Sequence, residues 1–175
     1  MMLLLCCTVL AACGGSSQQR AAAPSGPPAQ RVCNGELRAA GALISGAHVR
    51  ILDRDPTNIE CLVSKGAVTI DTVAQASELA WTEYDTTSVH LIQAFGSGPV
   101  HVASELPHQV PGLGGNSLWV PAQRELIATN GSQSQGGSYV TVKVKGTSSG
   151  LALATAVAGA TLKLAPRGSN PPAPS

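Results

Sequence analysis

The chain has few aromatic residues and few charged ones. Aromatic side chains make up 3% of its 175 residues and charged side chains 12%, whereas a charged share of about 25% is usual. A hydrophobic core must therefore come mainly from Val, Leu, Ile and Ala. The formal net charge is only +1, and binding to phosphate backbones needs a strong basic field. We therefore expect no nucleic-acid partner.

The chain has little of what catalysis by a nucleophilic serine needs. Residues 146–150, GTSSG, match the spacing of a G-x-S-x-G elbow, but few acids are available to orient a base. The Gly-rich stretch at residues 112–115 lacks the Gly-Lys-Ser/Thr ending of a phosphate loop, so a turn with positive φ is the better interpretation. We expect no catalytic residue, no cofactor and no bound metal, and hence a protein that is not an enzyme.

One group of residues has the side-chain types of a metal site at short spacing. It consists of His101, Glu105 and His108, with Pro107 inside the second gap. Two histidines and a carboxylate are the ligand set of many zinc hydrolases, but the proline breaks the helical spacing that would bring them together. We expect a surface loop here and keep a metal-dependent hydrolase as the less favoured alternative.

No apolar run in the chain is long enough to span a bilayer. The run at residues 1–12 falls short of the roughly 20 residues required but fits the apolar core of a signal peptide. It ends in Leu10-Ala11-Ala12-Cys13, which resembles the bacterial lipobox, in which the cysteine thiol receives a diacylglyceryl group. We therefore expect a lipid anchor at Cys13 on the outer face of the cell membrane. The alternative is an ordinary secretory signal that leaves Cys13 as a free thiol.

The composition divides the chain into four segments. Residues 1–12 are the predicted signal peptide, and residues 13–30 are the lipidated cysteine followed by a small, polar, Pro-rich tether. Residues 31–165 form the predicted α+β domain, and residues 166–175 are a second Pro-rich tail. The tether and the tail cannot bury enough surface to offset their ordering entropy.

Two cysteines remain inside the predicted domain, Cys33 and Cys61. An even pair in an oxidising compartment favours a disulfide. The alternatives are two separate buried thiols or, less favoured at this long spacing, a metal pair.

Hydrophobic periodicity predicts three helices and about five strands. We expect helices at residues 37–44, with Asn34 as N-cap, at 75–95, with a possible break at 85–87, and at 151–164. We expect strands at 59–63, 68–72, 118–120, 125–130 and 139–145, and a loop at 107–115. The order α-β-β-α-β-β-β-α predicts a single antiparallel sheet of about five strands with the helices on one face.

The last predicted strand alternates most clearly. Its valines at 140, 142 and 144 face one way, and Tyr139, Thr141, Lys143 and Lys145 face the other. Because an antiparallel sheet can expose one face to water, these four residues are the candidate interaction surface.

Several of these features occur together in a family of lipoproteins from high-GC Gram-positive bacteria that carry a small domain of unknown function. The chain resembles this family over residues 33–164. The resemblance rests on Cys33 and Cys61, the Val-Pro-Gly-Leu-Gly loop at 110–114, the Trp-Val-Pro at 119–121, the strand pair 126–131 and 139–142, and the Ala-rich last helix. It implies a secreted, anchored α+β domain with the two cysteines bridged, and it implies no activity.

The sequence thus predicts a membrane-anchored binding module without enzymatic activity. Its partner would be a protein, a cell-wall component or a lipid outside the cytoplasmic membrane. The alternative is a carrier that holds a lipid or small apolar ligand between the sheet and the helices.

Overall fold

The chain folds around one antiparallel sheet with helices on both faces. The computed structural model describes residues 26–96, 106–113 and 116–168. The sheet has seven strands in the order β1-β2-β3-β7-β6-β5-β4, and all neighbouring strands are antiparallel. The α+β class predicted from the sequence is confirmed. Along the chain the elements are α1 (Pro28–Gly41), β1 (His48–Asp55), β2 (Asn58–Lys65), β3 (Val68–Ser77), α2 (Ala80–Gly96), β4 (His108–Gln109), β5 (Ser117–Val120), β6 (Glu125–Thr129), β7 (Gly137–Lys145) and α3 (Gly150–Leu164).

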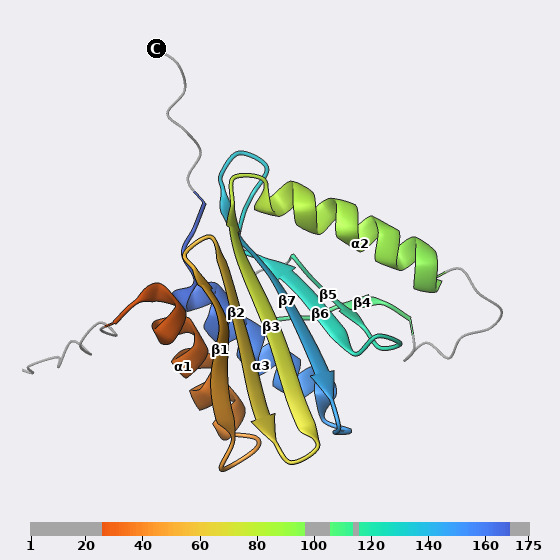
Figure 1. Ribbon diagram of the computed structural model, residues 1–175. Helices are drawn as coiled ribbons and strands as arrows, with labels where there is room; N and C mark the ends of the chain where they lie inside the picture. The colour runs from red at the N-terminus through yellow and green to blue at the C-terminus, as the bar shows by residue number, and fades with distance from the viewer. Residues whose placement is uncertain (1–25, 97–105, 114–115, 169–175) are drawn as a thin grey trace, which may run out of the picture.

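Strand alternation produces two separate hydrophobic clusters. In β6, Leu126 and Ala128 belong to the larger cluster with α1 and α3, whereas Ile127 belongs to a smaller cluster with α2. Successive side chains of a strand point to opposite faces, so the two clusters lie on opposite sides of the sheet. Figure 1 shows α1 and α3 side by side behind the sheet and α2 across the other face, near β5–β7. The prediction that all helices cover one face is wrong.

Two strands, β1 and β4, were not predicted. In β1 the sequence HVRILDRD carries four charged residues, and a register shift between Ile51 and Asp53 interrupts its period of two. Only Val49 and Ile51 of this strand pack against the core. β4 has two residues inside the predicted loop and exists because it pairs with β5. The observed order is therefore α-β-β-β-α-β-β-β-β-α, with seven strands in place of the predicted five.

Helix α1 begins nine residues earlier than the sequence pattern indicated. It starts at Pro28, a residue suited to the first turn because its missing N–H needs no partner there. Asn34, the predicted N-cap, is an exposed residue in the middle of the helix. Ala29, Val32 and Cys33 bury the first two turns. The helix therefore begins inside the predicted tether, and the polar residues of its outer face concealed it.

Helix α2 is continuous through residues 85–87, where a break was predicted. The Ser77 hydroxyl accepts a hydrogen bond from the Leu79 N–H (3.0 Å) and donates one to Glu83 (2.9 Å). This arrangement acts like a capping box and positions the helix start after β3. Gln75, assigned to this helix from the sequence, instead lies in β3.

The hairpin of β2 and β3 and the last helix match their predictions closely. Ile59, Cys61 and Val63 face the core formed with α1 and α3, and α3 begins one residue before the predicted start. The Gly168 N–H donates to the Gly137 carbonyl (2.9 Å), so the first residues of the predicted tail lie against β7. No helix in the described part of the chain is long and apolar enough to cross a membrane.

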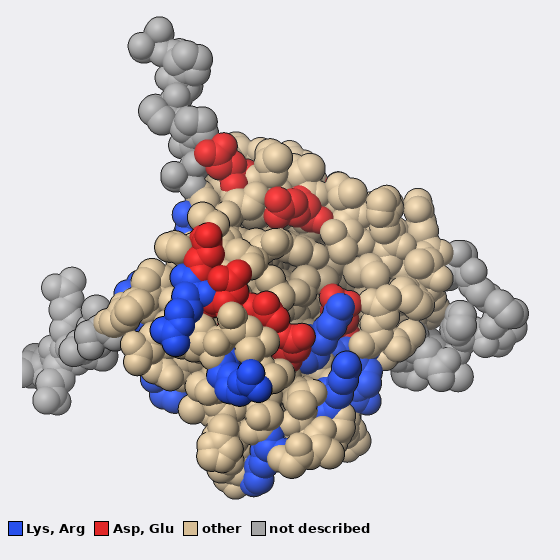
Figure 2. Space-filling model, viewed as in Figure 1, with Lys and Arg blue, Asp and Glu red and all other residues tan. Residues whose placement is uncertain are grey.

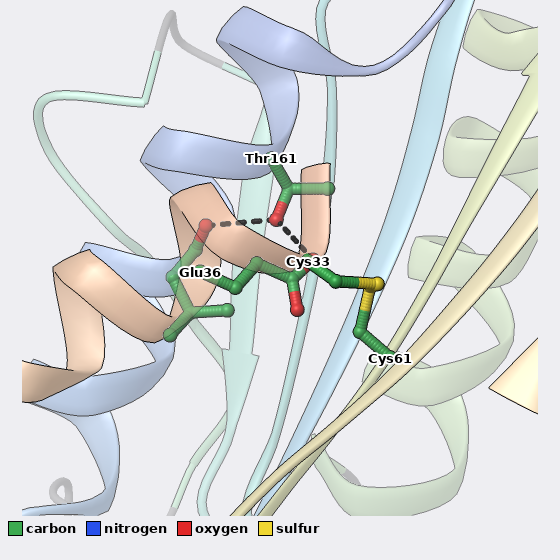
Figure 3. Close-up of a disulfide and its surroundings, with 5 residues drawn as sticks. Cys33, Glu36, Cys61 and Thr161 are labelled. Atoms are coloured by element: carbon green, nitrogen blue, oxygen red, sulfur yellow. Dashed lines mark hydrogen bonds between the residues drawn. A yellow bond between two sulfur atoms is a disulfide. The ribbon is translucent and has the colours of Figure 1, made fainter. Parts of the chain in front are cut away.

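A disulfide joins Cys33 of α1 to Cys61 of β2 (Figure 3). Both cysteines are fully buried and their Cα atoms lie 5.5 Å apart. The predicted bond is present, and it connects the first helix to the sheet across the larger cluster. Large aromatic side chains stabilise the cores of many proteins, and this core has few of them. The disulfide stabilises the folded state in a different way, by restricting the unfolded chain.

Removing the disulfide is expected to destabilise the fold by about 3.5 kcal/mol, because the bond closes a loop of 28 residues in the unfolded chain. Urea denaturation of a Cys33→Ala/Cys61→Ala variant measures this loss. The wild type kept reduced during the titration is the matched control and should lose a similar amount. A loss below about 1 kcal/mol in both would contradict the loop-closure account.

Candidate functional site

Among the residues that the structure describes, no helix covers half of one sheet face. Helix α2 packs on β5, β6, β7 and the end of β3, and it leaves the same face of β1, β2 and most of β3 open. We call this surface the open face. By strand register its residues are Arg50, Glu60, Leu62, Asp71, Val73, Thr141, Lys143 and Lys145. The two apolar members, Leu62 and Val73, are half-buried, so the open face has an apolar floor within a charged border.

Charges of alternating sign cross the open face in one row. The register places Arg50 opposite Leu62, Leu62 opposite Asp71, Asp71 opposite Lys143, and Lys143 opposite Glu125. Directly opposed side chains in an antiparallel sheet are close enough to interact. The Lys143 Nζ lies 3.7 Å from Glu125 Oε1. Burial raises the pKa of Glu125, and the nearby Lys143 charge opposes that rise.

Beside this row, toward the edge of the sheet, acids lie next to one another. Asp53 of β1 lies opposite Glu60 of β2, and Figure 2 shows a diagonal band of acidic side chains with basic side chains on both sides. The pKa of Asp53 is lowered by hydrogen bonds from the Asp55 N–H and the Asn58 amide. The open face therefore carries both signs of charge in a fixed pattern.

The predicted interaction surface lies on this face, but α2 divides it. Lys143 and Lys145 are exposed and Thr141 is half-buried. Tyr139 is only 8% exposed because it packs beneath α2 with Ala80 and Tyr84, and burial raises its pKa. The period of two correctly placed the four residues on one face. It carried no information about the helix that covers one end of that face.

A shallow hollow of about 390 Å³ lies beside Tyr139, between α2 and β3. Threonine hydroxyls and a Gln75 amide line it, together with Glu83. One Glu83 carboxylate oxygen accepts from Ser77, and the other has no hydrogen-bond partner within the described part of the chain. The hollow extends the open face under α2 and adds hydrogen-bonding groups to it. Sequence analysis missed this feature because its residues come from three separate elements.

The residues of the alternative metal site are not brought together in what the structure describes. His101 and Glu105 lie outside the described residues. His108 is exposed on β4, and its Nδ1 lies 3.0 Å from the Leu106 carbonyl oxygen. Across residues 26–96, 106–113 and 116–168, no group of three or more His, Cys, Asp or Glu could hold a metal ion. Gly112 has a φ of +89°, as expected for a turn.

The interior contains a polar cluster that the sequence did not reveal. Glu36 of α1 is fully buried beside the disulfide, one helical turn after Cys33 (Figure 3). The Thr161 Oγ1 of α3 lies 2.8 Å from Glu36 Oε1 and 2.9 Å from the Val157 carbonyl oxygen. A hydroxyl has one proton to donate, so both contacts are hydrogen bonds only when a protonated Glu36 donates to Thr161.

Burial raises the pKa of Glu36 to about 8, although the neighbouring Thr161 and Thr72 hydroxyls oppose the shift by favouring the ionised carboxylate. The side chain is therefore neutral at neutral pH, in agreement with the donor role just described. Glu36 has no exposed surface, so a substrate cannot contact it. We interpret the cluster as a structural element of the core that makes stability depend on pH.

Folding stability should fall as the pH rises from about 4.5 to about 8. The folded state holds a proton on Glu36 in this range, whereas the unfolded state releases it, so each increase in pH favours unfolding. A Glu36→Gln variant should lose most of this slope, and urea denaturation between the two pH limits measures it. Glu125 contributes a slope of the same sign to both proteins. Parallel stability curves for the two proteins would contradict the assignment.

Comparison with known proteins gives no further guide to the site. No protein-family model, no curated protein and no solved structure matches the chain. The resemblance to anchored lipoproteins of high-GC Gram-positive bacteria therefore stays a prediction, and a function has to follow from the placement of the chain's own residues.

Proposed function

We propose that this chain is an anchored, extracytoplasmic binding module without enzymatic activity, and that it binds a protein partner through the open face. The observation that carries the proposal is the uncovered half of the sheet. It offers half-buried Leu62 and Val73 within a border of charged residues. Apolar patches rimmed by polar groups are typical of protein interaction sites.

The charge pattern favours a protein over a polyanion as the partner. Asp71 and Lys143 sit side by side in the row, with Arg50 and Glu125 at its ends. A surface of alternating sign is complementary to another surface of alternating sign, and such complementarity sets specificity and orientation. A nucleic acid or another uniformly negative chain would be attracted by the basic residues of the row but repelled by its acidic residues.

The shape of the surface also supports binding over catalysis. The sheet floor is broad and shallow, and the hollow beside Tyr139 is open to solvent. Binding sites for small substrates are usually concave and bury most of the ligand. The one strongly perturbed carboxyl, Glu36, is inside the core and away from this surface.

Two features of the chain support the extracytoplasmic location. The lipobox-like Leu10-Ala11-Ala12-Cys13 predicts lipidation at Cys13, and the disulfide is of the kind that persists in oxidising compartments. Two or more acyl chains at one cysteine give stable membrane anchoring. The partner would therefore lie at the outer membrane surface or in the cell wall.

A photo-reactive amino acid at Val73 should crosslink to a protein in intact cells. The matched control carries it at Gln123, an exposed residue of the turn between β5 and β6. Reversing one charge of the row, Lys143→Glu, should reduce the Val73 adduct at least about tenfold, because a like charge opposite a partner's acid costs more than 1 kcal/mol. An adduct of equal yield from Val73 and Gln123 would count against a specific interface at the open face.

Cells supplied with radiolabelled fatty acid should transfer the label to this protein through Cys13. A Cys13→Ala variant should carry no label and should leave the membrane fraction. The Cys33 and Cys61 thiols are buried and bonded to each other, so they cannot account for labelling. A wild-type protein that is unlabelled and released from cells would refute the anchor while leaving the crosslinking test unaffected.

A further inference from the structure

The layer formed by α1 and α3 carries charge of only one sign on its outside. Within α1, α3 and the described residues 106–113 and 165–168, Glu36 is the sole acid, and it is fully buried. The same segments expose Arg38, Lys163 and Arg167. The other described acids lie on β1–β3, on β6, or in and just before α2. The two sides of the molecule therefore differ in charge.

A groove runs between these two helices and the loop at residues 111–113. It has a volume of about 560 Å³ and is open to solvent. Arg38 stands on the α1 wall and Lys163 on the α3 wall, while glycine and alanine residues form most of the remaining lining. Small residues keep the floor of the groove low, and the Arg38 and Lys163 side chains on its walls are exposed to solvent.

The two cations of the groove make no side-chain bonds within the fold. In the described part of the chain, the Arg38 and Lys163 side chains form no hydrogen bond and no ion pair, and each residue lies in the last turn of its helix. Other cations do form such bonds: Arg124 donates to the Val144 carbonyl (3.0 Å), and Lys65 donates to the Ser45 carbonyl. The charges of Arg38 and Lys163 are therefore available to an external anion.

From this charge segregation we propose that the α1–α3 face docks on an anionic phospholipid bilayer. Helices of 14 and 15 residues lie side by side there, which gives a basic surface about 21 Å long. Each Lys or Arg near an anionic bilayer contributes about 1 kcal/mol of attraction. The open face carries acidic as well as basic residues. It is therefore less complementary to an anionic bilayer than the α1–α3 face is.

The position of α1 in the chain agrees with this orientation. Pro28 begins the helix fifteen residues after Cys13, and fifteen residues span about 20 Å as a coil and about 50 Å when fully extended. A lipid at Cys13 would keep α1 within reach of the headgroups and direct the open face away from them. The orientation rests on the proposed anchor, whereas lipid binding by the α1–α3 face can be tested without it.

The test uses residues 14–175, which lack the lipidated cysteine and retain every described element, both hydrophobic clusters and the disulfide. Co-sedimentation is measured with phosphatidylcholine vesicles and with vesicles that contain about one third phosphatidylglycerol. We expect binding to the anionic vesicles only, weakening as salt screens the interaction. Equal binding to both kinds of vesicle, or no binding to either, would overturn the proposal.

Two charge-matched variants identify the face. Arg38→Ser/Lys163→Ser should weaken binding to anionic vesicles at least about tenfold, from two lost contacts of about 1 kcal/mol each. Arg50→Ser/Lys145→Ser removes the same charge from exposed positions on the open face and should change binding less than about twofold. An equal loss in both variants would show a net-charge effect and overturn the docking face. Self-association lost only in the first variant, without vesicle binding, would assign the face to a second copy of the chain.

Because this protein has no acyl chain, its vesicle binding is independent of Cys13. It is also independent of the open face, since the variant expected to lose binding, Arg38→Ser/Lys163→Ser, alters no residue of that face. Failure of the vesicle test would therefore leave the crosslinking test of the proposed function intact.

Discussion

A seven-stranded sheet has two faces to cover, and the described part of the chain contains three helices with which to cover them. Two helices pack side by side on one face, where they form the larger hydrophobic cluster. The third spans only β5–β7 and the end of β3 on the other face. Leu62 and Val73 stay half-exposed as a result. The uncovered half of the sheet thus results from the number of helices. It forms a broad surface with apolar, acidic and basic side chains.

The larger cluster is built from small and medium aliphatic side chains, and Trp119 is the aromatic residue among its described buried members. Such a core gains less from each residue than one filled with large rings. The disulfide from Cys33 to Cys61 offsets part of this difference by restricting the unfolded chain. Glu36 has the opposite effect, because its burial beside the disulfide requires a proton and leaves one carboxyl oxygen without a partner among the described residues. Together these two features give a core whose stability depends on both oxidation and pH.

The two sides of the molecule suit different neighbours. The α1–α3 side exposes cations without nearby acids, whereas the open face alternates charges across neighbouring strands. The proposed anchor at Cys13 lies fifteen residues before Pro28, where the first helix of the α1–α3 side begins. In this arrangement a bilayer and a protein partner do not compete for one surface, since each would contact a different layer of the fold.

Local patterns were sufficient where a residue's environment depends on its immediate neighbours in the chain. The alternation in residues 139–145, the β2–β3 hairpin, the last helix and the cysteine pair could all be predicted, because a period of two or 3.6 and an even cysteine count are properties of the sequence. The same patterns failed at β1, where charges and a register shift hide the period, and at the start of α1, where polar residues mask an amphipathic helix.

The sequence by itself therefore determined the α+β class, the faces of its clearest strands and the residues that form the disulfide. Only the tertiary structure decided which face each helix covers, because that choice depends on contacts between segments far apart in the chain. It buried Tyr139 under α2, left Lys143 and Lys145 exposed, and enclosed Glu36 between α1 and α3. The charge separation between the two sides has the same origin, since no local pattern records which distant cations will share a surface.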